Sequence, residues 1–489
     1  MSRLPAWALA VPGIAIAAVP LLIGLQRGPT LDASVFAVIA EEMRRGGVPY
    51  RDFFDHKPPV IYLAEWSLGV AVPFLDAWTR AWALTVAGAL GTLALLAWKL
   101  SPARSIGTVL ALAALGPLLG AEYFAQGGGQ TESLAVLPAT AGFLLAAGEQ
   151  RPLTGRSMAA GVLFGIGGAT SFQVAPVALG ALACLIVAGG GVRAAAAFLA
   201  GGSIVALLIL SWLALVGALP AALEQLLVYN RAYLTGQSFL HPIPLLNVAV
   251  AALILSPLVS AVAVRLTELV VRRDGDPAEV GSAVAILAWA ALVVMQGQFI
   301  GHYAIVLAAP LAILGVPVFN RLRVWLIARR TRLLAILAMA LSIAFPVIVI
   351  GTTEHGPAPR PPIHEASSAI ERHVQAGSSI FIWGNEPYPY LLTRTRPAGP
   401  FTYLFPLTKA GYTTAAMVRD LLGDWERQPP AAIVDASYHP RAASSHPLLG
   451  PWHLVGPLVP DELDPLREFV RERYRVAATI DDWTIYVPN

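Results

Sequence analysis

The side chains best suited to chemistry gather between Gly28 and Pro59, in a stretch that separates two strongly apolar regions. Only 13% of the 489-residue chain is charged. This stretch nevertheless holds Asp32, Glu41, Glu42, Asp52, Asp55, Arg44, Arg45, Arg51, His56 and Lys57. A second acidic segment, GGGQTESL, carries Glu132. Carboxylates accept protons and lysine binds anions, so these segments together predict a reaction centre.

Asp32 and Lys57 are the main candidates for catalysis and anion binding. Asp32 directly follows the first apolar segment, and the HKPP motif with Lys57 comes soon afterwards. An ordinary aspartate has a pKa of about 4, so it is ionised at neutral pH and accepts a proton. Lys57 offers a positive charge to a phosphate, in a turn stiffened by two prolines. The structural alternatives are a helix cap for Asp32, a snorkelling interfacial anchor for Lys57, and an acid at a helix N-terminus for Glu132.

Further side chains are candidates to join Lys57 in binding a phosphate. They are Arg51, His56, His302 and Arg231. In the structural alternative, Asp52 and Asp55 pair with the neighbouring bases. His302 and Tyr303 would then belong to an interfacial aromatic belt, and Arg231 to a solvated helix face.

Metal binding stays open at this point. Asp32, Glu132 and His302 are ligand types that a divalent cation uses, but no diagnostic spacing, such as His-x-x-x-His on one helix, is present. Gly127–Gly129 follows no predicted strand and is therefore not a nucleotide-binding loop. Cys184 is the single cysteine, which excludes a disulfide within the chain. No other cofactor is indicated.

The composition predicts an α-helical polytopic membrane protein. Hydrophobic residues make up 56% of the chain, against about 45–50% in soluble domains. The net charge of +3 is small and the basic residues are not pooled, which argues against a nucleic-acid partner. We expect about eleven transmembrane helices. Their ranges are 5–26, 77–98, 104–121, 131–148, 157–172, 173–190, 194–217, 244–267, 279–298, 301–319 and 332–352.

Three amphipathic segments are expected to lie in the membrane interface rather than cross the bilayer. They are residues 33–45, 59–74 and 220–235. The segment 59–74 spans only about 24 Å as a helix, short of a hydrocarbon core of about 30 Å, and it carries Glu65. In residues 33–45, apolar side chains alternate with acids and arginines in the pattern of an interfacial helix.

The arginines and lysines of the short loops predict the orientation in an inner or plasma membrane. They all fall on one side of the bilayer if residues 59–74 do not cross it. The clusters are Arg3, Lys99 with Arg104, Arg151 with Arg156, Arg193, Arg265 with Arg272 and Arg273, and Arg321 through Arg332. Residues 5–26 are then an uncleaved first helix whose N-terminus is cytoplasmic. Asp32, Lys57, Glu132 and the chain from residue 353 lie outside.

Residues 353–489 predict a small extracytoplasmic α/β domain that follows the transmembrane domain of residues 1–352. Charged residues and prolines become frequent, and helical and strand patterns alternate. We expect helices at 363–375, 412–427 and 461–472. We expect strands at 379–383, 431–435, 474–479 and 483–487.

The motifs around Asp32 resemble those of the glycosyltransferase C superfamily, in its branch of protein O-mannosyltransferases and lipid A aminoarabinose transferases. The resemblance rests on Asp32, the amphipathic segment after it, VPYRDFFDHKPP and the QTE loop. GHYAIVLAAPLAILG (301–315) and IFIWGNEPYPYLLTRTRPAGPF (380–401) also resemble bacterial members. Asp32 is followed here by Ala33, and Thr131-Glu132 stands where the family has a second acidic pair.

The resemblance implies transfer of a sugar from a polyprenyl-phosphate donor to an extracytoplasmic glycan, lipid or protein. Asp32 would then be the general base of an inverting reaction, and Glu132 a second catalytic residue that orients the acceptor or holds the surroundings of Asp32. Membrane lipids surround such an enzyme, and family members differ in metal dependence. Tyr303, Trp383 and Glu386 become candidates for contact with the sugar or acceptor, because WGNEPYPY has aromatic character suited to stacking on sugars. A packed turn at the joint between the domains is the structural alternative for that segment.

A transporter or flippase of a lipid-linked sugar is the rival from another functional class. Transporters carry charged residues near the bilayer midplane, on broken helices that often belong to internal repeats. Here the ionisable residues collect at the outer ends of the predicted helices and no repeat is visible. A third alternative is a non-catalytic subunit of polysaccharide assembly, which would tolerate the loss of Asp32. The sequence favours the enzyme.

Overall fold

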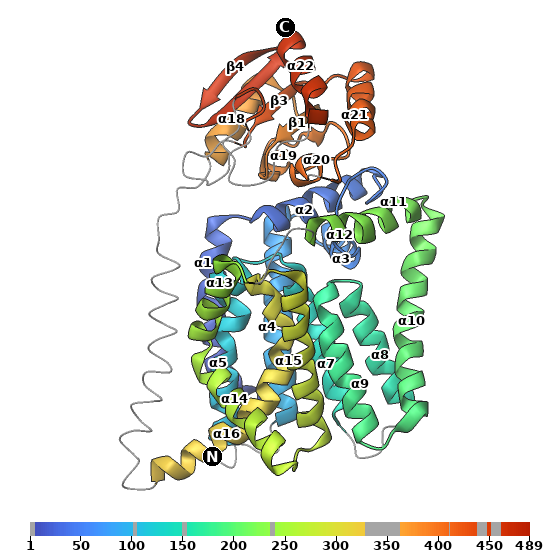
Figure 1. The fold of residues 1–489 in the computed structure, drawn as a ribbon. Helices are drawn as coiled ribbons and strands as arrows, with labels where there is room; N and C mark the ends of the chain where they lie inside the picture. The colour runs from blue at the N-terminus through green and yellow to red at the C-terminus, as the bar shows by residue number, and fades with distance from the viewer. Residues whose placement is uncertain are drawn as a thin grey trace.

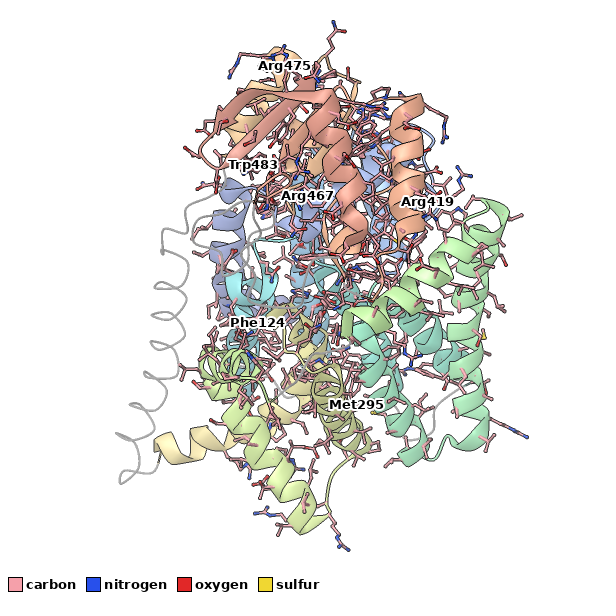
Figure 2. The ribbon with its side chains drawn as sticks, turned by 45° about the horizontal axis from the view of Figure 1, so that its top comes forward. Phe124, Met295, Arg419, Arg467, Arg475 and Trp483 are labelled. Atoms are coloured by element: carbon pink, nitrogen blue, oxygen red, sulfur yellow. The ribbon has the colours of Figure 1, made fainter. Side chains whose placement is uncertain are left out.

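The structure, a computed structural model, describes residues 5–100, 105–148, 154–234, 240–327, 362–409, 411–437, 447–450 and 461–489. Figure 1 shows three layers: a helix bundle, a layer of short helices above it, and a small sheet with its own helices on top. Exposed apolar side chains such as Met295 lie on the bundle, whereas Arg419 and Arg475 are exposed on the C-terminal part (Figure 2). This distribution fits a bundle embedded in lipid below a part that meets water.

The helices of the bundle follow the predicted apolar segments closely. Four described helical stretches are long and apolar enough to cross a membrane, and two bent pairs of helices would raise this number to six. About eleven spans therefore stays a prediction. The bundle consists of α1 (Val11–Arg27), α4 (Ala77–Leu100), α5 (Ile106–Gly120), α7 (Thr131–Ala146), α8 (Thr154–Gly168), α9 (Ala175–Val187), α10 (Gly191–Leu215), α13 (Pro242–Ile254), α14 (Ser256–Arg272), α15 (Pro277–Gln296) and α16 (Ala308–Ile327).

Two expected spans differ in the structure. Residues 244–267 do not form one straight helix, because α13 and α14 meet at an angle of 94°. Pro257 stands in the first turn of α14, where it lacks the N–H that one continuous helix would need. The expected span 301–319 begins with a 3-10 helix, η5 (Gly301–Leu307), before α16. The predicted helix 332–352 lies outside the described residues.

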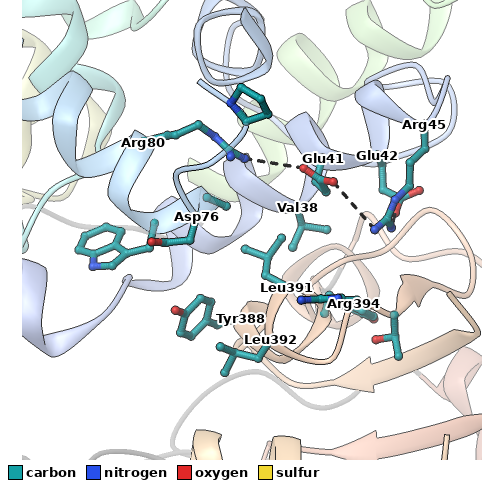
Figure 3. Close-up of a pocket in the computed structure, with 15 residues that line it drawn as sticks. Val38, Glu41, Glu42, Arg45, Asp76, Arg80, Tyr388, Leu391, Leu392 and Arg394 are labelled. Atoms are coloured by element: carbon teal, nitrogen blue, oxygen red, sulfur yellow. Dashed lines mark hydrogen bonds and ion pairs between the residues drawn. The ribbon is translucent and has the colours of Figure 1, made fainter. Parts of the chain in front are cut away.

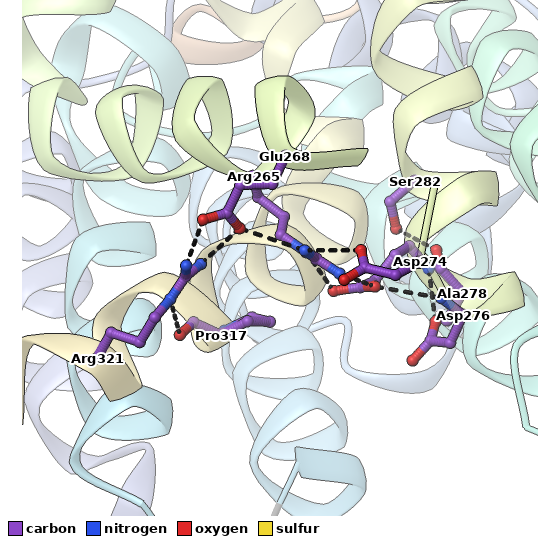
Figure 4. Close-up of polar contacts among 9 residues, drawn as sticks. Arg265, Glu268, Asp274, Asp276, Ala278, Ser282, Pro317 and Arg321 are labelled. Atoms are coloured by element: carbon purple, nitrogen blue, oxygen red, sulfur yellow. Dashed lines mark hydrogen bonds and ion pairs between the residues drawn. The ribbon is translucent and has the colours of Figure 1, made fainter. Parts of the chain in front are cut away.

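The end of the bundle farthest from the sheet is tied together by an ion-pair network (Figure 4). Arg265 of α14 donates to both carboxylate oxygens of Glu279 of α15, at 2.7 and 2.6 Å. Glu268 bridges Arg265 and Arg321 of α16. Asp276 caps α15 in a capping box with Glu279. Two of the arginines that predict the orientation therefore also fasten helices to one another.

The middle layer contains the three amphipathic segments expected at the interface. Residues 33–45 correspond to α2 (Leu31–Arg44), and residues 59–74 to α3 (Val60–Ala71). Residues 220–235 form α11 (Leu219–Leu223), a π-helical turn η4 (Glu224–Tyr229) and α12 (Asn230–Leu234). Helix α2 packs beneath the C-terminal part and α12 lies beside it (Figure 1).

The C-terminal part is built on a five-stranded sheet in the order β2-β1-β3-β5-β4. The strands are β1 (Ser379–Trp383), β2 (Arg396–Pro397), β3 (Ala432–Asp435), β4 (Tyr474–Ile480) and β5 (Trp483–Pro488). β1 pairs in parallel with β2 and β3, and the other pairs are antiparallel. The expected helices are α18 (Ile363–His373), α21 (Ala415–Arg427) and α22 (Asp464–Arg473); α19 (Tyr388–Leu392), α20 (Phe405–Thr408) and β2 were not expected. The predicted domain boundary near residue 353 falls outside the described residues.

Direct contacts join the C-terminal part to the middle layer. Arg396 donates twice to the buried Glu42 of α2, at 3.0 and 2.7 Å. The amide of Phe54 donates to the carbonyl of Pro400 at 2.7 Å. Beside these contacts lies a cavity of about 330 Å³ between α2, the start of α4 and α19. In Figure 3 its upper wall shows Glu41 between Arg80 and Arg45.

Candidate active site

Two cavities meet where the bundle, the middle layer and the C-terminal part come together. The first, of about 230 Å³, is lined by Asp32, by the turn after α2, by η5, and by Tyr403 and Phe405 of the C-terminal part. The second, of about 290 Å³, is lined by Glu132 and by side chains of η4, α12 and the end of α15. His56, Lys57, Tyr233 and Tyr303 line both cavities. Lys57 therefore stands at the junction between them.

The ammonium of Lys57 lies among acidic groups and over an aromatic ring. Its Nζ is 5.9 Å from the centre of the Tyr303 ring. Burial opposes the charge, but the acidic groups around it, Tyr303, Asp32, Glu132 and Asp55, outweigh burial and raise the pKa of Lys57. A fixed cation at the junction of two cavities is suited to hold an anion such as a phosphate.

The turn that carries Lys57 is held by the buried Asp55 and by two tyrosines. Asp55 accepts hydrogen bonds from the backbone amide of His56 and from the Tyr62 hydroxyl, each at 2.6 Å. Burial would raise the pKa of Asp55, but the side chains of His56 and Tyr62 and the charge of the nearby Lys57 lower it. The Tyr50 hydroxyl donates to the carbonyl of Lys57 at 2.6 Å. The second acid of DFFDHKPP therefore serves to fix the turn.

The middle layer also contacts this turn from α12 and η4. The side-chain amide of Asn230 donates to the carbonyl of His56 at 3.0 Å, and Gln225 accepts from the amide of Asp55 at 3.1 Å. The ring of Tyr233 stacks on that of His56, with centres 5.6 Å apart. Residues distant in sequence thus determine the backbone position from which the Lys57 side chain projects.

Asp32 is the second residue of α2 and projects into the first cavity. Thr30 is the N-cap of this helix, and its hydroxyl accepts a hydrogen bond from the Gln130 side chain at 3.2 Å. Among the described residues no hydrogen bond to the Asp32 carboxylate is formed. Its oxygens are therefore free to accept a proton from a ligand in the cavity.

Glu132 and His302 form a second polar group, in which Glu132 lines the second cavity and His302 lines the first. Ser171 donates to Glu132 Oε1 at 2.7 Å, and His302 Nε2 lies 3.7 Å from Glu132 Oε2. Glu132 Oε2 and both ring nitrogens of His302 are buried and have no hydrogen-bond partner among the described residues. Buried polar atoms are normally satisfied, so these atoms mark a place for a ligand or water. The described residues include no group of three side chains arranged to hold a metal ion.

The structure brings together six of the ten predicted site residues. They are Asp32, His56, Lys57, Glu132, His302 and Tyr303. The other four line neither cavity. Arg51 pairs with Asp52 and donates to the carbonyl of Val216, as the structural alternative predicts, and Arg231 is exposed on α12. Trp383 is fully buried in the core of the C-terminal part.

Glu386 is the fourth residue outside the two cavities, in the turn after β1. Its side chain is half-buried, and burial raises its pKa to about 7. It therefore carries a proton through much of the range in which ordinary carboxylates are charged.

Several residues of the site were not predicted from the sequence. Tyr229 and Tyr233 are spaced i, i+4 in the third amphipathic segment, and this spacing indicates one aromatic face. Tyr403 donates to Asp55 at 3.3 Å and lies 3.1 Å from His56 Nδ1. The sequence around Tyr403 does not predict a place in the site, because Tyr403 reaches the site only when the C-terminal part docks on α2.

Comparison with known proteins gives a structural likeness without a sequence match. No protein-family profile and no curated protein match the chain. ArnT from Cupriavidus metallidurans in the apo state superposes with a TM-score of 0.61 at 15% identity, over 97% of each chain. The same protein bound to undecaprenyl phosphate gives a TM-score of 0.59 at 15% identity, again over 97% of each chain. The Archaeoglobus fulgidus oligosaccharyltransferase tethered with an acceptor peptide gives 0.51 at 11% identity, over 86% of this chain and 68% of that one.

These likenesses define the class of the fold. The chain has the glycosyltransferase C fold, the fold of ArnT and of the archaeal oligosaccharyltransferase. Within that fold, the likeness to ArnT extends over nearly all of both chains. The resemblance in the motifs around Asp32 is thereby confirmed at the level of the fold.

Proposed function

We propose that this protein is a membrane glycosyltransferase that moves a sugar from a polyprenyl phosphate to an extracytoplasmic acceptor. The observation that carries the proposal is the position of Lys57 at the junction between the cavity with Asp32 and a second, more apolar cavity. A buried anion site with a free carboxylate beside it matches the needs of phosphate departure and hydroxyl attack.

The second cavity suits the lipid side of the donor. Leu226, Leu227 and Phe172 contribute apolar walls, and Lys57 stands where these walls end. Part of the wall is open to the surroundings of the bundle, since Phe172 and Leu227 are exposed. The structural neighbour ArnT binds undecaprenyl phosphate. In this proposal the polyprenyl chain enters between helices and its phosphate contacts Lys57, supported by His56 and His302.

The first cavity suits the reacting sugar and the acceptor hydroxyl. An acceptor oxygen attacks the anomeric carbon, a new carbon–oxygen bond forms, and the bond to the phosphate oxygen breaks. Asp32 takes the hydroxyl proton, and polyprenyl phosphate leaves with its negative charge beside Lys57. A single displacement of this kind inverts the anomeric configuration. Glu132 orients the donor phosphate from the second cavity, and His302 does so from the first.

The proposal includes a position in the cell. The bundle lies in an inner or plasma membrane, with the N-terminus in the cytoplasm and the C-terminal sheet outside. The exposed apolar side chains of the bundle and the charged surface of the C-terminal part support this placement. The acceptor is then a glycan, lipid or protein of the cell envelope.

A donor screen with an Asp32→Asn variant tests the function. Purified protein in lipid is incubated with radiolabelled polyprenyl-phosphate sugars and envelope extract, and transfer of the sugar is measured. The variant keeps size and most hydrogen-bonding capacity, so we expect wild-type donor binding and a loss of transfer of about 100-fold or more. Near-normal transfer by the folded variant would remove Asp32 from the mechanism. Translocation of the donor across a vesicle membrane without any transfer would instead favour a flippase.

A further inference from the structure

The glycine-rich loop GGGQ, which the proposed mechanism does not use, has an unusual backbone. Gly127, Gly128 and Gly129 all have positive φ angles, of 75°, 123° and 80°. The residue before them, Gln126, is also left-handed, with φ 50° and ψ 40°. A left-handed conformation is natural for glycine but strained for glutamine. Gln126 is therefore held in this conformation by its surroundings.

The three glycines are required because the loop is wedged between helices. A Cβ atom at Gly129 would lie 2.5 Å from the Cβ of Ala33 in α2, and a Cβ at Gly24 of α1 would lie 2.5 Å from the Cα of Gly127. The amide of Gly129 donates to the Thr85 hydroxyl of α4 at 2.7 Å. The loop is thus fixed against α1, α2 and α4, next to Asp32.

The Gln126 side chain is held by one end only. Its Oε1 accepts a hydrogen bond from Gln130 Nε2 at 2.9 Å, and the same nitrogen contacts the Thr30 hydroxyl. Gln126 lines the first cavity together with Asp32. The Gln126 amide nitrogen makes no hydrogen bond within the part of the chain that the structure describes. Gln126 therefore offers two N–H donors from the wall of the cavity that Asp32 also lines.

We propose that Gln126 is a specificity-determining residue that donates hydrogen bonds to an oxygen of the transferred sugar. This inference rests on the proposed function. The cavity of about 230 Å³ lies below the common range of ligand pockets, about 300–1,000 Å³, which suits one sugar ring rather than a longer glycan. Asp32 contributes an acceptor and Gln126 contributes donors, so the two together recognise neighbouring oxygens. Left-handed non-glycine residues are enriched at active sites and ligand clamps.

The substitution Gln126→Gly separates a role in sugar recognition from a purely structural role. Glycine accepts the left-handed backbone without strain, so Gln126→Gly should leave the melting temperature unchanged or slightly higher. Arg273 offers a matched control, because it is left-handed too, with φ 57°, and is exposed at the end of α14 far from the site. Arg273→Gly gives the same backbone relief without removing a side chain from the cavity.

The test compares binding of bare undecaprenyl phosphate with binding of undecaprenyl phosphate that carries the sugar selected in the donor screen. Titrations use the wild type, Gln126→Gly, Gln126→Glu and Arg273→Gly in the same lipid. Gln126→Glu keeps the shape but replaces the donors with a carboxylate. We expect both Gln126 variants to lose about 3–10-fold in affinity for the sugar-carrying lipid, while affinity for bare lipid stays within about twofold. Arg273→Gly should match the wild type.

The outcomes separate this inference from the proposed function. Equal affinities of Gln126→Gly and the wild type for the sugar-carrying lipid would overturn the role of Gln126. An equal loss of affinity for both lipids would also overturn it, because the defect would then lie in the site as a whole. Failure of the wild-type protein to bind either lipid would overturn the proposed function, and the inference with it.

Discussion

Replacement of Lys57 by methionine is the sharpest test of the anion site. Methionine keeps the length of the aliphatic stem and removes only the ammonium group. That ammonium lies at the junction of the two cavities and is surrounded by Asp32, Asp55 and Glu132. The turn should persist, because the bonds from Tyr50 and Tyr62 are made to the backbone of Lys57 and to Asp55.

The expected loss follows from the contact that is removed. A hydrogen bond between charged groups contributes about 1.5–3 kcal/mol, so affinity for undecaprenyl phosphate should fall by about 10–100-fold. The loss should be similar with and without a sugar on the lipid, because Lys57 acts on the phosphate. Lys57→Arg should lose less affinity than Lys57→Met, since arginine keeps the positive charge but carries it on a planar group of different shape.

The assay is a calorimetric titration with undecaprenyl phosphate, accompanied by a melting curve for each variant. Arg51→Met is the matched control, because Arg51 lies in the same loop but pairs with Asp52 and Val216 outside the cavities. It should bind as the wild type does. Wild-type affinity of a folded Lys57→Met protein would refute the reasoning and return Lys57 to the role of an interfacial anchor.

Two further predictions concern the C-terminal part and the orientation. Burial raises the pKa of Glu386 to about 7 from an ordinary 4.5, so the folded state holds a proton that the unfolded state loses. The free energy of unfolding should therefore fall between about pH 4.5 and 7, by at most about 3 kcal/mol, and melting curves of Glu386→Gln should lack this decline. A cysteine at Ala77, in a Cys184→Ala background, should react with a membrane-impermeant thiol reagent on intact cells, and one at Leu100 should not. Labelling of Leu100 alone would invert the proposed orientation, and labelling at both ends would show that α4 does not cross the membrane.

The sequence was sufficient for most elements of the fold. Apolar length located most bundle helices to within a few residues, and the segment 59–74 was recognised as a short helix, which is α3. Hydropathy alone did not reveal the 94° bend between α13 and α14, because both halves are apolar; the signal was Pro257. Two very short elements, β2 and α20, form through contacts with neighbours distant in sequence.

The candidate site was predicted where its residues carry a local pattern. Asp32 and Lys57 stand in a stretch whose charge is conspicuous against an apolar chain, and both line the first cavity. Arg51 has the same local context, yet it turns to Asp52, and sequence spacing does not distinguish these outcomes. Tyr403 joins the site through tertiary docking, which no local pattern encodes. Gln126 was missed because the adjacent glycines were tested only as a nucleotide-binding loop.

Tyr403 and Phe405 line the cavity beside Asp32 from the C-terminal part. They are the last of its lining residues to be translated. Asp32, Lys57, Glu132 and Tyr303 are already synthesised and inserted when these two residues are still untranslated. A nascent chain with all its described bundle helices in place therefore has an open, incomplete pocket. Docking of the sheet, fastened by Arg396 on Glu42, completes the pocket only near the end of biosynthesis. Chains stalled before that point would remain inert in the membrane.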